Sequence, residues 1–252
     1  MEKSDLNKLL EIRGVRKHFS GVIAVDHCDI EIEKGKITAL IGPNGAGKTT
    51  LFNVISGILQ VDDGEIVFSG EPIIGKSVEQ ISNLGLSRLL QHSHIFENLT
   101  VQQNIALAIN NTAASFWMSI FGTSRINGEL AALATQLLNN FDLFGKKETV
   151  CLELSFGQRR LIELIRAIVN PHELLMLDEP VAGIAPAARE KIGTTLKERA
   201  ARGDTILLIE HDMAFTLGVA DKVIVMDKGR IIAVGTPDFV RNDQKVMDAY
   251  LG

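Results

Sequence analysis

The chain has 252 residues, of which 46% are apolar, 23% are charged and 5% are aromatic. This is the composition of an ordinary globular protein, and it excludes collagen-like, low-complexity and disordered classes. The 26 Lys and Arg residues against 31 Asp and Glu residues give a net charge of -5, which disfavours nucleic acid as a partner. Cys28 and Cys151 have no C-x-x-C spacing, so neither a disulfide framework nor a thiolate zinc site is predicted.

Two segments bear on location. The first 14 residues mix charged side chains with short apolar pairs and lack the apolar region of a secretory signal, so we expect the chain to remain in the cytosol. Residues 98–124 carry no charge, but amide and hydroxyl side chains interrupt them. Because buried amides are costly in hydrocarbon, no membrane-spanning helix is predicted there.

The first region alternates strands with one strong helix. Residues 9–13 and 25–32 have strand character, and the apolar run Ile37–Ile41 is typical of a buried strand. That run leads directly into the glycine-rich residues 42–47. A helix is predicted over residues 48–58, where apolar residues recur at helical spacing.

The middle of the chain, residues 92–155, is predicted to be a mostly helical subdomain. It begins with a Thr-x-x-Gln capping box at Thr100, and Gly128–Asn140 has one apolar face. It is inserted into a core formed by residues 1–91 and 156–252. The second part of that core alternates strands with helices, which is the pattern of an α/β fold with a parallel sheet. Its predicted strands are 174–177, 205–209 and 222–226, and its predicted helices are 186–201 and 212–220.

Residues 42–49 match the phosphate-binding pattern G-x-x-x-x-G-K-[ST], between a predicted strand and a predicted helix. Glycines allow successive N–H groups to turn inward and to cradle phosphate oxygens at the positive end of a helix. Lys48 would reach the β- and γ-phosphates, and the Thr49 hydroxyl would ligate Mg²⁺. The predicted ATP-binding residues here are Gly42, Pro43, Asn44, Gly45, Ala46, Gly47, Lys48, Thr49 and Thr50.

Asp178 and Glu179 end an apolar strand, and open α/β sheets bind ligands at the carboxyl ends of their strands. A nucleotide hydrolase needs one carboxylate for the metal and one group that orients or deprotonates water. Asp178 suits the first role and Glu179 the second. Taken alone, the pair is equally consistent with a polar strand end, and the phosphate loop upstream favours the catalytic interpretation.

Residues 154–160 read Leu-Ser-Phe-Gly-Gln-Arg-Arg. Ser155 and Gln158 form a capping box that opens a helix, and in isolation a plain helix cap is the favoured interpretation. A phosphate loop, then this L-S-x-G-Q stretch, then an apolar strand ending in Asp-Glu closely resembles the ATP-binding subunit of ABC transporters over nearly the whole chain.

The resemblance implies an α/β P-loop ATPase core, an N-terminal antiparallel β subdomain and an inserted helical subdomain. It also implies a head-to-tail pair with ATP between one phosphate loop and the partner's signature helix. Carried over to this sequence, the signature residues that contact the partner's ATP are Ser155, Gly157 and Gln158.

Further roles follow from the same resemblance. Gln91 would contact Mg²⁺ with Thr49 and Asp178 and would sense the transport subunit. His211 would act with Glu179 as a catalytic residue, on the γ-phosphate, and Phe19 would lie against adenine. A capping or surface role for His211 and a core position for Phe19 stay open.

Two positions depart from the family pattern. Phe156 stands where most members have Gly, and Ala185 replaces the acid common in the D-loop, which leaves the coupling between the two ATP sites open. Together with the ending at residues 246–251, these features look like the branched-chain amino-acid importer subfamily. The lipopolysaccharide-export ATPase shares that ending.

The sequence therefore predicts an ATPase that uses ATP and Mg²⁺ to energise import of a small solute, most plausibly a branched-chain or related amino acid. Its expected partners are a second copy or a paralogous ATPase subunit and integral membrane permease subunits, with the chain peripheral on the cytoplasmic face of the inner membrane. The alternatives are a lipopolysaccharide-export-type ATPase, a soluble non-transport ABC ATPase and a small-molecule kinase. An apolar patch around Phe116 and Trp117 would either dock the permease or pack inside the helical subdomain.

Overall fold

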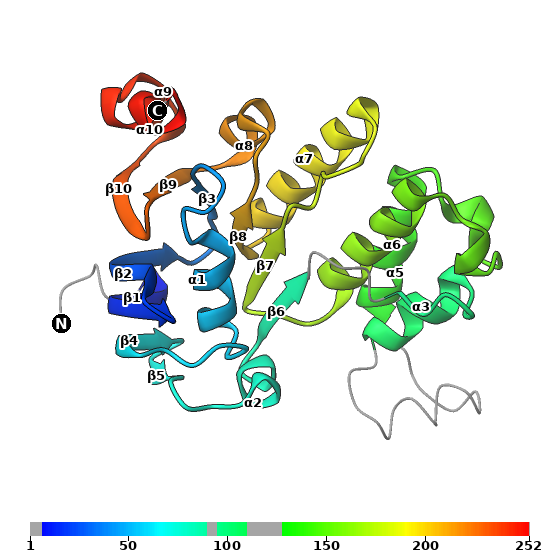
Figure 1. The fold of residues 1–252 in the computed structure, drawn as a ribbon. Coiled ribbons are helices and arrows are strands. Elements are labelled where there is room, and N and C mark those ends of the chain that lie inside the picture. The colour runs from blue at the N-terminus through cyan, green and yellow to red at the C-terminus, as the bar shows by residue number, and fades with distance from the viewer. Residues whose placement is uncertain (1–6, 90–94, 110–127, 252) are drawn as a thin grey trace. The chain divides into compact units, whose positions relative to one another are not determined.

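The computed structural model describes residues 7–89, 95–109 and 128–251 (Figure 1). The contacts group the chain into two units. The first comprises Met1–Arg88, Glu173–Glu179 and Gly193–Gly252, and the second comprises Leu89–His172 and Pro180–Ile192. The domain boundaries predicted from the sequence stay a prediction. The contact units differ from them in placing the signature helix with the helical residues rather than with the core.

The first unit contains a four-stranded antiparallel sheet with the order β2-β1-β4-β5. Its strands are β1 (Lys8–Phe19), β2 (Val22–Glu33), β4 (Asp63–Phe68) and β5 (Glu71–Pro72). The two strands predicted at 9–13 and 25–32 are present and longer, because β1 and β2 pair as a hairpin up to the contact between Phe19 and Val22. This sheet is the N-terminal antiparallel β subdomain that the resemblance implied.

The second sheet has the order β10-β9-β3-β8-β7-β6. Its strands are β3 (Ile37–Ile41), β6 (Leu86–Leu89), β7 (Leu174–Asp178), β8 (Thr205–Ile209), β9 (Lys222–Asp227) and β10 (Arg230–Gly235). The four strands β9, β3, β8 and β7 pair in parallel, as predicted. Strand β10 is antiparallel to β9, because a turn of two residues joins them and leaves no length for a crossover. Every residue of β3, β7 and β8 is buried, as expected for strands covered on both faces.

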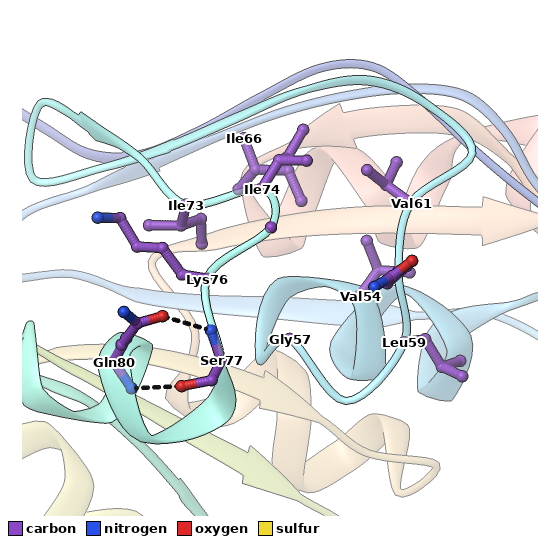
Figure 2. A pocket seen from close by; sticks show the side chains of 12 residues that line it. Val54, Gly57, Leu59, Val61, Ile66, Ile73, Ile74, Lys76, Ser77 and Gln80 are labelled. Carbon is purple, nitrogen blue, oxygen red and sulfur yellow. Dashed lines mark hydrogen bonds between the residues drawn. The ribbon is translucent and has the colours of Figure 1, made fainter.

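The helices of the first unit are α1 (Lys48–Ile55), α2 (Val78–Asn83), α8 (Met213–Val219), α9 (Pro237–Asn242) and α10 (Gln244–Leu251). Helix α1 is shorter than the predicted 48–58, because the chain turns at Ser56 and Gly57, whose φ of +73° ends the helix. Helix α2 begins with a capping box between Ser77 and Gln80, beside a cavity of about 470 Å³ that is lined largely by apolar side chains (Figure 2).

The second unit contains α3 (Val101–Ile109), α5 (Gly128–Asn140), α6 (Phe156–Val169) and two short 3-10 turns, Phe144–Lys146 and Cys151–Glu153. Helix α7 (Pro186–Ala201) begins in this unit and ends in the first. Asn104 is fully buried at the centre of the second unit, where its side-chain amide donates to the Phe96 carbonyl and to the Cys151 sulfur. These bonds satisfy a buried amide and tie α3 to the segment that precedes α6.

In the parts of the chain that the structure describes, no helix combines the length and the apolar character needed to cross a bilayer. The patch predicted around Phe116 and Trp117 lies outside the described residues, and so does Gln91.

Candidate active site

The loop that joins β3 to α1 is shaped by its glycines. Gly42 and Gly47 have φ values of +151° and +102°. A Cβ atom at Gly42 would overlap the Met226 carbonyl oxygen, and a Cβ atom at Gly47 would overlap the carbonyl oxygen of Ala24. The close approach of these neighbours therefore excludes any side chain at either position.

Helix α1 starts without a side-chain cap, since its N-cap residue is Gly47 and no side chain accepts a hydrogen bond from its first turn. The amide groups at this end point toward the space that the loop encloses, where an anion can act as the cap. Lys48 is 6% exposed, and its Nζ donates to the Gly42 and Pro43 carbonyl oxygens at 2.7 and 2.9 Å. Burial lowers the pKa of Lys48, and the nearby carboxylates of Glu179 and Asp178 oppose that shift.

The two carboxylates lie at the end of β7, as the sequence predicted. Asp178 is 1% exposed. Glu179 has a φ of +50°, a left-handed conformation that costs energy for a residue with a side chain, and its N–H donates to the Ile209 carbonyl at 2.9 Å. Strained residues of this kind concentrate at functional sites, where the surrounding structure holds them in place.

The structure brings Glu179 and His211 together. His211 follows β8, the parallel neighbour of β7, and its Nε2 lies 2.6 Å from Glu179 Oε1. The adjoining Glu210 is buried, and its carboxylate accepts a hydrogen bond from the His211 backbone N–H at 3.0 Å. The resemblance predicted roles for both residues, but their direct contact was not predicted.

Arg88 is a site residue that sequence reasoning missed. Its side chain is 8% exposed, and its Nη2 lies 3.4 Å from Asp178 Oδ2. Its Nη1 donates to Asn53 and Ser56 on α1 at 2.8 and 2.7 Å. Arg88 thereby joins the helix after the phosphate loop to the carboxylate at the end of β7. The only sequence signal was one charged residue in the short segment Leu86–Leu89, which begins and ends with leucine.

Phe19 lies at the end of the β1–β2 hairpin and is 42% exposed, with Lys17 Nζ 5.5 Å from its ring centre. The same hairpin contributes Ala24, which contacts Gly47 of the phosphate loop. Phe19 is therefore not a core residue, and its exposed ring is available to a planar ligand near the loop.

Ser155 begins α6 as predicted. Its Oγ accepts from the Gln158 N–H at 3.3 Å, and its own N–H donates to Gln158 Oε1 at 3.1 Å. The Phe156 side chain is 62% exposed and lies over Gly183, where an added Cβ would come within 2.7 Å of the Phe156 ring. The segment after β7 that contains Gly183 therefore contacts the signature residues of the same chain, which the sequence did not reveal.

The residues present fit a divalent cation that arrives with a nucleotide. Thr49 offers an exposed hydroxyl at the start of α1, and Asp178 offers a carboxylate. These are hard oxygen donors of the kind that Mg²⁺ prefers, with phosphate oxygens supplying the rest of its shell. Within the described ranges no cluster of three His, Cys, Asp or Glu residues could hold a metal without such help.

A phosphate loop of this geometry, at the carboxyl edge of an α/β sheet and facing two carboxylates, places the chain among P-loop nucleoside triphosphatases. Comparison with known proteins narrows the class. Residues 25–182 match the ABC transporter family, and residues 230–252 match the family described as branched-chain amino acid ATP-binding cassette transporter.

Relatives align along almost the whole length of the chain. The high-affinity branched-chain amino acid transport ATP-binding protein LivG of Escherichia coli K12 is 34% identical over 97% of this chain and 98% of its own length. The corresponding protein BraF of Pseudomonas aeruginosa is 33% identical, with the same coverage. The chain belongs to the ATP-binding proteins of ABC transporters, in the branched-chain amino acid (LivG and BraF) subfamily. It is therefore the subunit that binds ATP and hydrolyses it to drive transport.

Solved structures agree with the fold. A nucleotide-free ATP-binding cassette from an ABC transporter superposes with a TM-score of 0.81 at 33% identity, covering 97% of this chain and 99% of the other. The ADP conformation of MJ1267, also an ATP-binding cassette of an ABC transporter, gives the same values. The predicted α/β ABC ATPase fold is confirmed.

Proposed function

We propose that this chain energises the import of branched-chain or related amino acids. The observation that carries the proposal is the match of residues 230–252 to the branched-chain family, joined to full-length similarity to transport proteins of that name. The catalytic chain would lie peripherally on the cytoplasmic face of the inner membrane and would act through integral permease subunits. The relatives reported above are branched-chain amino acid transport proteins, which favours this cargo over the lipopolysaccharide-export and non-transport alternatives.

In this proposal the triphosphate lies in the loop of residues 42–47, against the uncapped amides of α1. Lys48 leaves the carbonyls of Gly42 and Pro43 and turns to the β- and γ-phosphates, where its charge is better satisfied. Phe19 stacks on the adenine ring. Thr50, in the first turn of α1, completes the phosphate contacts.

We assign Thr49, Gln91 and Asp178 to Mg²⁺. When bound, the ion supplies charge neutralisation at the β- and γ-phosphates. Arg88 keeps the Asp178 carboxylate at the end of β7, where it faces the loop. This assignment accounts for a buried carboxylate beside a lysine at the floor of the site.

Hydrolysis then needs one activated water. Glu179 accepts a proton as the water oxygen bonds to the γ-phosphorus, and the bond to the β–γ bridging oxygen breaks to release ADP. His211 Nε2 contacts Glu179 Oε1, and we assign this histidine to the γ-phosphate of bound ATP. The left-handed backbone at Glu179 fixes the direction of its side chain before substrate arrives.

A second ATPase subunit, either another copy of this chain or a paralogue, completes the site from the other side. Its Ser155, Gly157 and Gln158 present a helix N-terminus to the γ-phosphate. Ala185 offers no carboxylate for a contact between the two copies, so the coupling of the two sites depends on other residues.

The proposal is tested by replacing the chromosomal copy with Lys48→Ala and measuring uptake of radiolabelled leucine. Loss of the lysine removes charge stabilisation of the phosphates, and ATP hydrolysis falls about 100- to 1000-fold. We expect leucine uptake to fall to the level of a deletion strain while uptake of an unrelated sugar is unchanged. Normal leucine uptake by a variant that no longer hydrolyses ATP would refute the assignment of cargo.

A further inference from the structure

The β1–β2 hairpin ends at the ring that is proposed to stack on adenine. Phe19 is the last residue of β1, and the turn residues Ser20 and Gly21 follow it with φ values of +40° and +94°. Positive φ at both positions is typical of the tight turns that join antiparallel strands. On the β2 side, the Ala24 carbonyl lies against Gly47 of the phosphate loop. The hairpin that carries Phe19 is therefore fixed to the loop through its second strand.

Strand pairing is irregular on the other side of the hairpin. The register of β1 against β2 shifts on both sides of Lys17. The pairing of β1 with β4 ends where Arg16 meets Asp63, so it does not reach the end of β1 (Figure 1). A register shift disrupts the ladder and changes the direction of side chains. Contacts other than strand pairing therefore have to hold the residues that lead to Phe19.

Asp62 supplies these contacts from the segment between α1 and β4. Its Oδ1 accepts a hydrogen bond from Lys17 Nζ at 2.7 Å. Its Oδ2 accepts from the His18 backbone N–H at 2.7 Å and lies 2.7 Å from His18 Nδ1. The backbone N–H of Asp62 donates to the Arg16 carbonyl at 3.0 Å. The hydrogen bonds from Lys17 and His18 lower the pKa of the Asp62 carboxyl, so it is ionised at neutral pH and holds both residues before Phe19.

The same carboxylate places a cation on the Phe19 ring. Lys17 Nζ, which Asp62 holds, lies over the ring at 5.5 Å from its centre. An ammonium group over a ring face is attracted to the π-electrons, most strongly where water is partly excluded, and both members of the Lys17–Asp62 pair are partly buried. One chain of contacts therefore joins Asp62 to the ring through Lys17.

We propose that Asp62 is a positioning residue for the adenine base, because it holds Lys17 and His18 so that the Phe19 ring meets the base in a fixed direction. The inference rests on the proposed stacking of Phe19 on adenine and extends the base site to the segment after α1. Asp62 acts on the base through Phe19, and the triphosphate is bound without it. The loss of Asp62 should therefore matter only for ligands that carry a base.

Asp62→Ala tests the inference with two ligands in calorimetric titrations. We expect affinity for ATP with magnesium to fall about three- to tenfold, as for the loss of hydrogen bonds that position a contact. Affinity for inorganic tripolyphosphate with magnesium should be unchanged, because this ligand has no base. The matched control is Asp63→Ala, since Asp63 is the exposed neighbour and its carboxylate accepts from the Gly64 N–H. The control should leave both affinities unchanged.

Three results of these titrations would overturn the inference: unchanged ATP affinity in Asp62→Ala, an equal loss for both ligands, or an equal loss of ATP affinity in the control. Asp62→Asn is a second variant that keeps the volume and one acceptor oxygen. It should show the same dependence on the base with a smaller loss. An equal loss for ATP and tripolyphosphate in this variant would also overturn the inference.

A double-mutant cycle with Phe19→Ala separates the inference from the proposed function. Phe19→Ala should weaken ATP binding by itself, and adding Asp62→Ala should weaken it no further, because Asp62 acts through the ring. Additive losses would contradict the inference alone. Unchanged ATP affinity in Phe19→Ala would contradict the stacking in the proposed function, and the inference with it.

Discussion

The start of α1 and the start of α6 are both suited to anions, but the chain builds them differently. At α1 the N-cap is Gly47 and the first turn has no side-chain cap. At α6, by contrast, the capping box already occupies the backbone amides of Ser155 and Gln158 and the Ser155 hydroxyl oxygen. One chain therefore has an uncapped helix N-terminus at the phosphate loop and a capped helix N-terminus at the signature residues.

We propose that the two helix ends have different roles in ATP binding. The uncapped end, with Lys48 beside it, would bind the nucleotide within one chain, because a phosphate supplies the hydrogen bonds that the helix lacks. The capped end gains little from an anion alone. In the proposed function it would contribute the Ser155 hydroxyl hydrogen, the Gly157 amide and the helix dipole only once a second chain has brought it to the γ-phosphate. Affinity should therefore depend on the first region and closure on the second.

The largest effect is expected at the loop side, from Glu179→Gln. The amide keeps the shape of the side chain but cannot accept the proton of the attacking water, so phosphate release should slow about 100- to 10,000-fold. ATP affinity should stay within about threefold, since Lys48 and the loop amides are intact. Phosphate release and fluorescent-nucleotide binding measure the two quantities separately. A Gln variant that hydrolyses ATP at the normal rate would show that Glu179 does not accept the proton of the attacking water.

A smaller effect is expected at the signature side, and the chain provides its own control. Ser77 caps α2 through a capping box with Gln80 (Figure 2), as Ser155 caps α6 with Gln158. The backbone-to-hydroxyl distances are 3.2 Å at Ser77 and 3.3 Å at Ser155. Both Ser→Ala variants should lose about 1 kcal/mol of stability in urea unfolding. Only Ser155→Ala should also lose ATPase activity, by about 10- to 100-fold, because a hydrogen bond to a charged phosphate is lost. Equal ATPase activity in the two variants would show that Ser155 acts only as a helix cap.

The smallest effect concerns the two thiols, one in each region. Cys28 is buried on β2 and donates to the Gly229 carbonyl at 3.2 Å, and burial raises its pKa from 9.0 to about 11. Burial also raises the pKa of Cys151, which precedes α6. Because only the thiolate reacts, native Cys28 should react with a disulfide reagent at pH 8 at least about 100-fold more slowly than in urea.

The raised pKa of Cys28 also makes the free energy of unfolding depend on pH. A thiol whose pKa is raised in the folded state favours folding below pH 9, and that contribution is lost as the pH rises toward 11. Labelling at several pH values, with each cysteine identified by mass spectrometry, measures how the reactivity of Cys28 changes with pH. Rapid labelling of native Cys28 at pH 8 would show that β2 opens readily around this residue.

Much of the fold followed from local sequence. The strands Ile37–Ile41 and Thr205–Ile209 and the helices Gly128–Asn140 and Pro186–Ala201 have the predicted bounds. Each of these strands is an uninterrupted apolar run that the sheet buries completely. Strands β4 and β10 were not predicted, because their residues are only partly buried and they gain order by pairing with β1 and β9.

The candidate site likewise contains residues that local sequence predicted and contacts that it did not predict. Spacing alone indicated the loop, the two carboxylates and the Ser155 cap, because each motif is contiguous in sequence. The contacts of His211 with Glu179 and of Arg88 with Asp178 join residues 32 and 90 positions apart. Only the order of strands in the sheet brings these pairs together.

The most direct test of the account is the molecular mass of Glu179→Gln by light scattering, with and without magnesium and ATP. One chain has a mass of 27.5 kDa. We expect that mass without nucleotide and twice that mass with ATP, because the blocked site keeps the triphosphate between the loop of one chain and Ser155 of the other. Adding Ser155→Ala should restore the single-chain mass. A variant that binds ATP fully and remains at 27.5 kDa would contradict the division of the site between two chains.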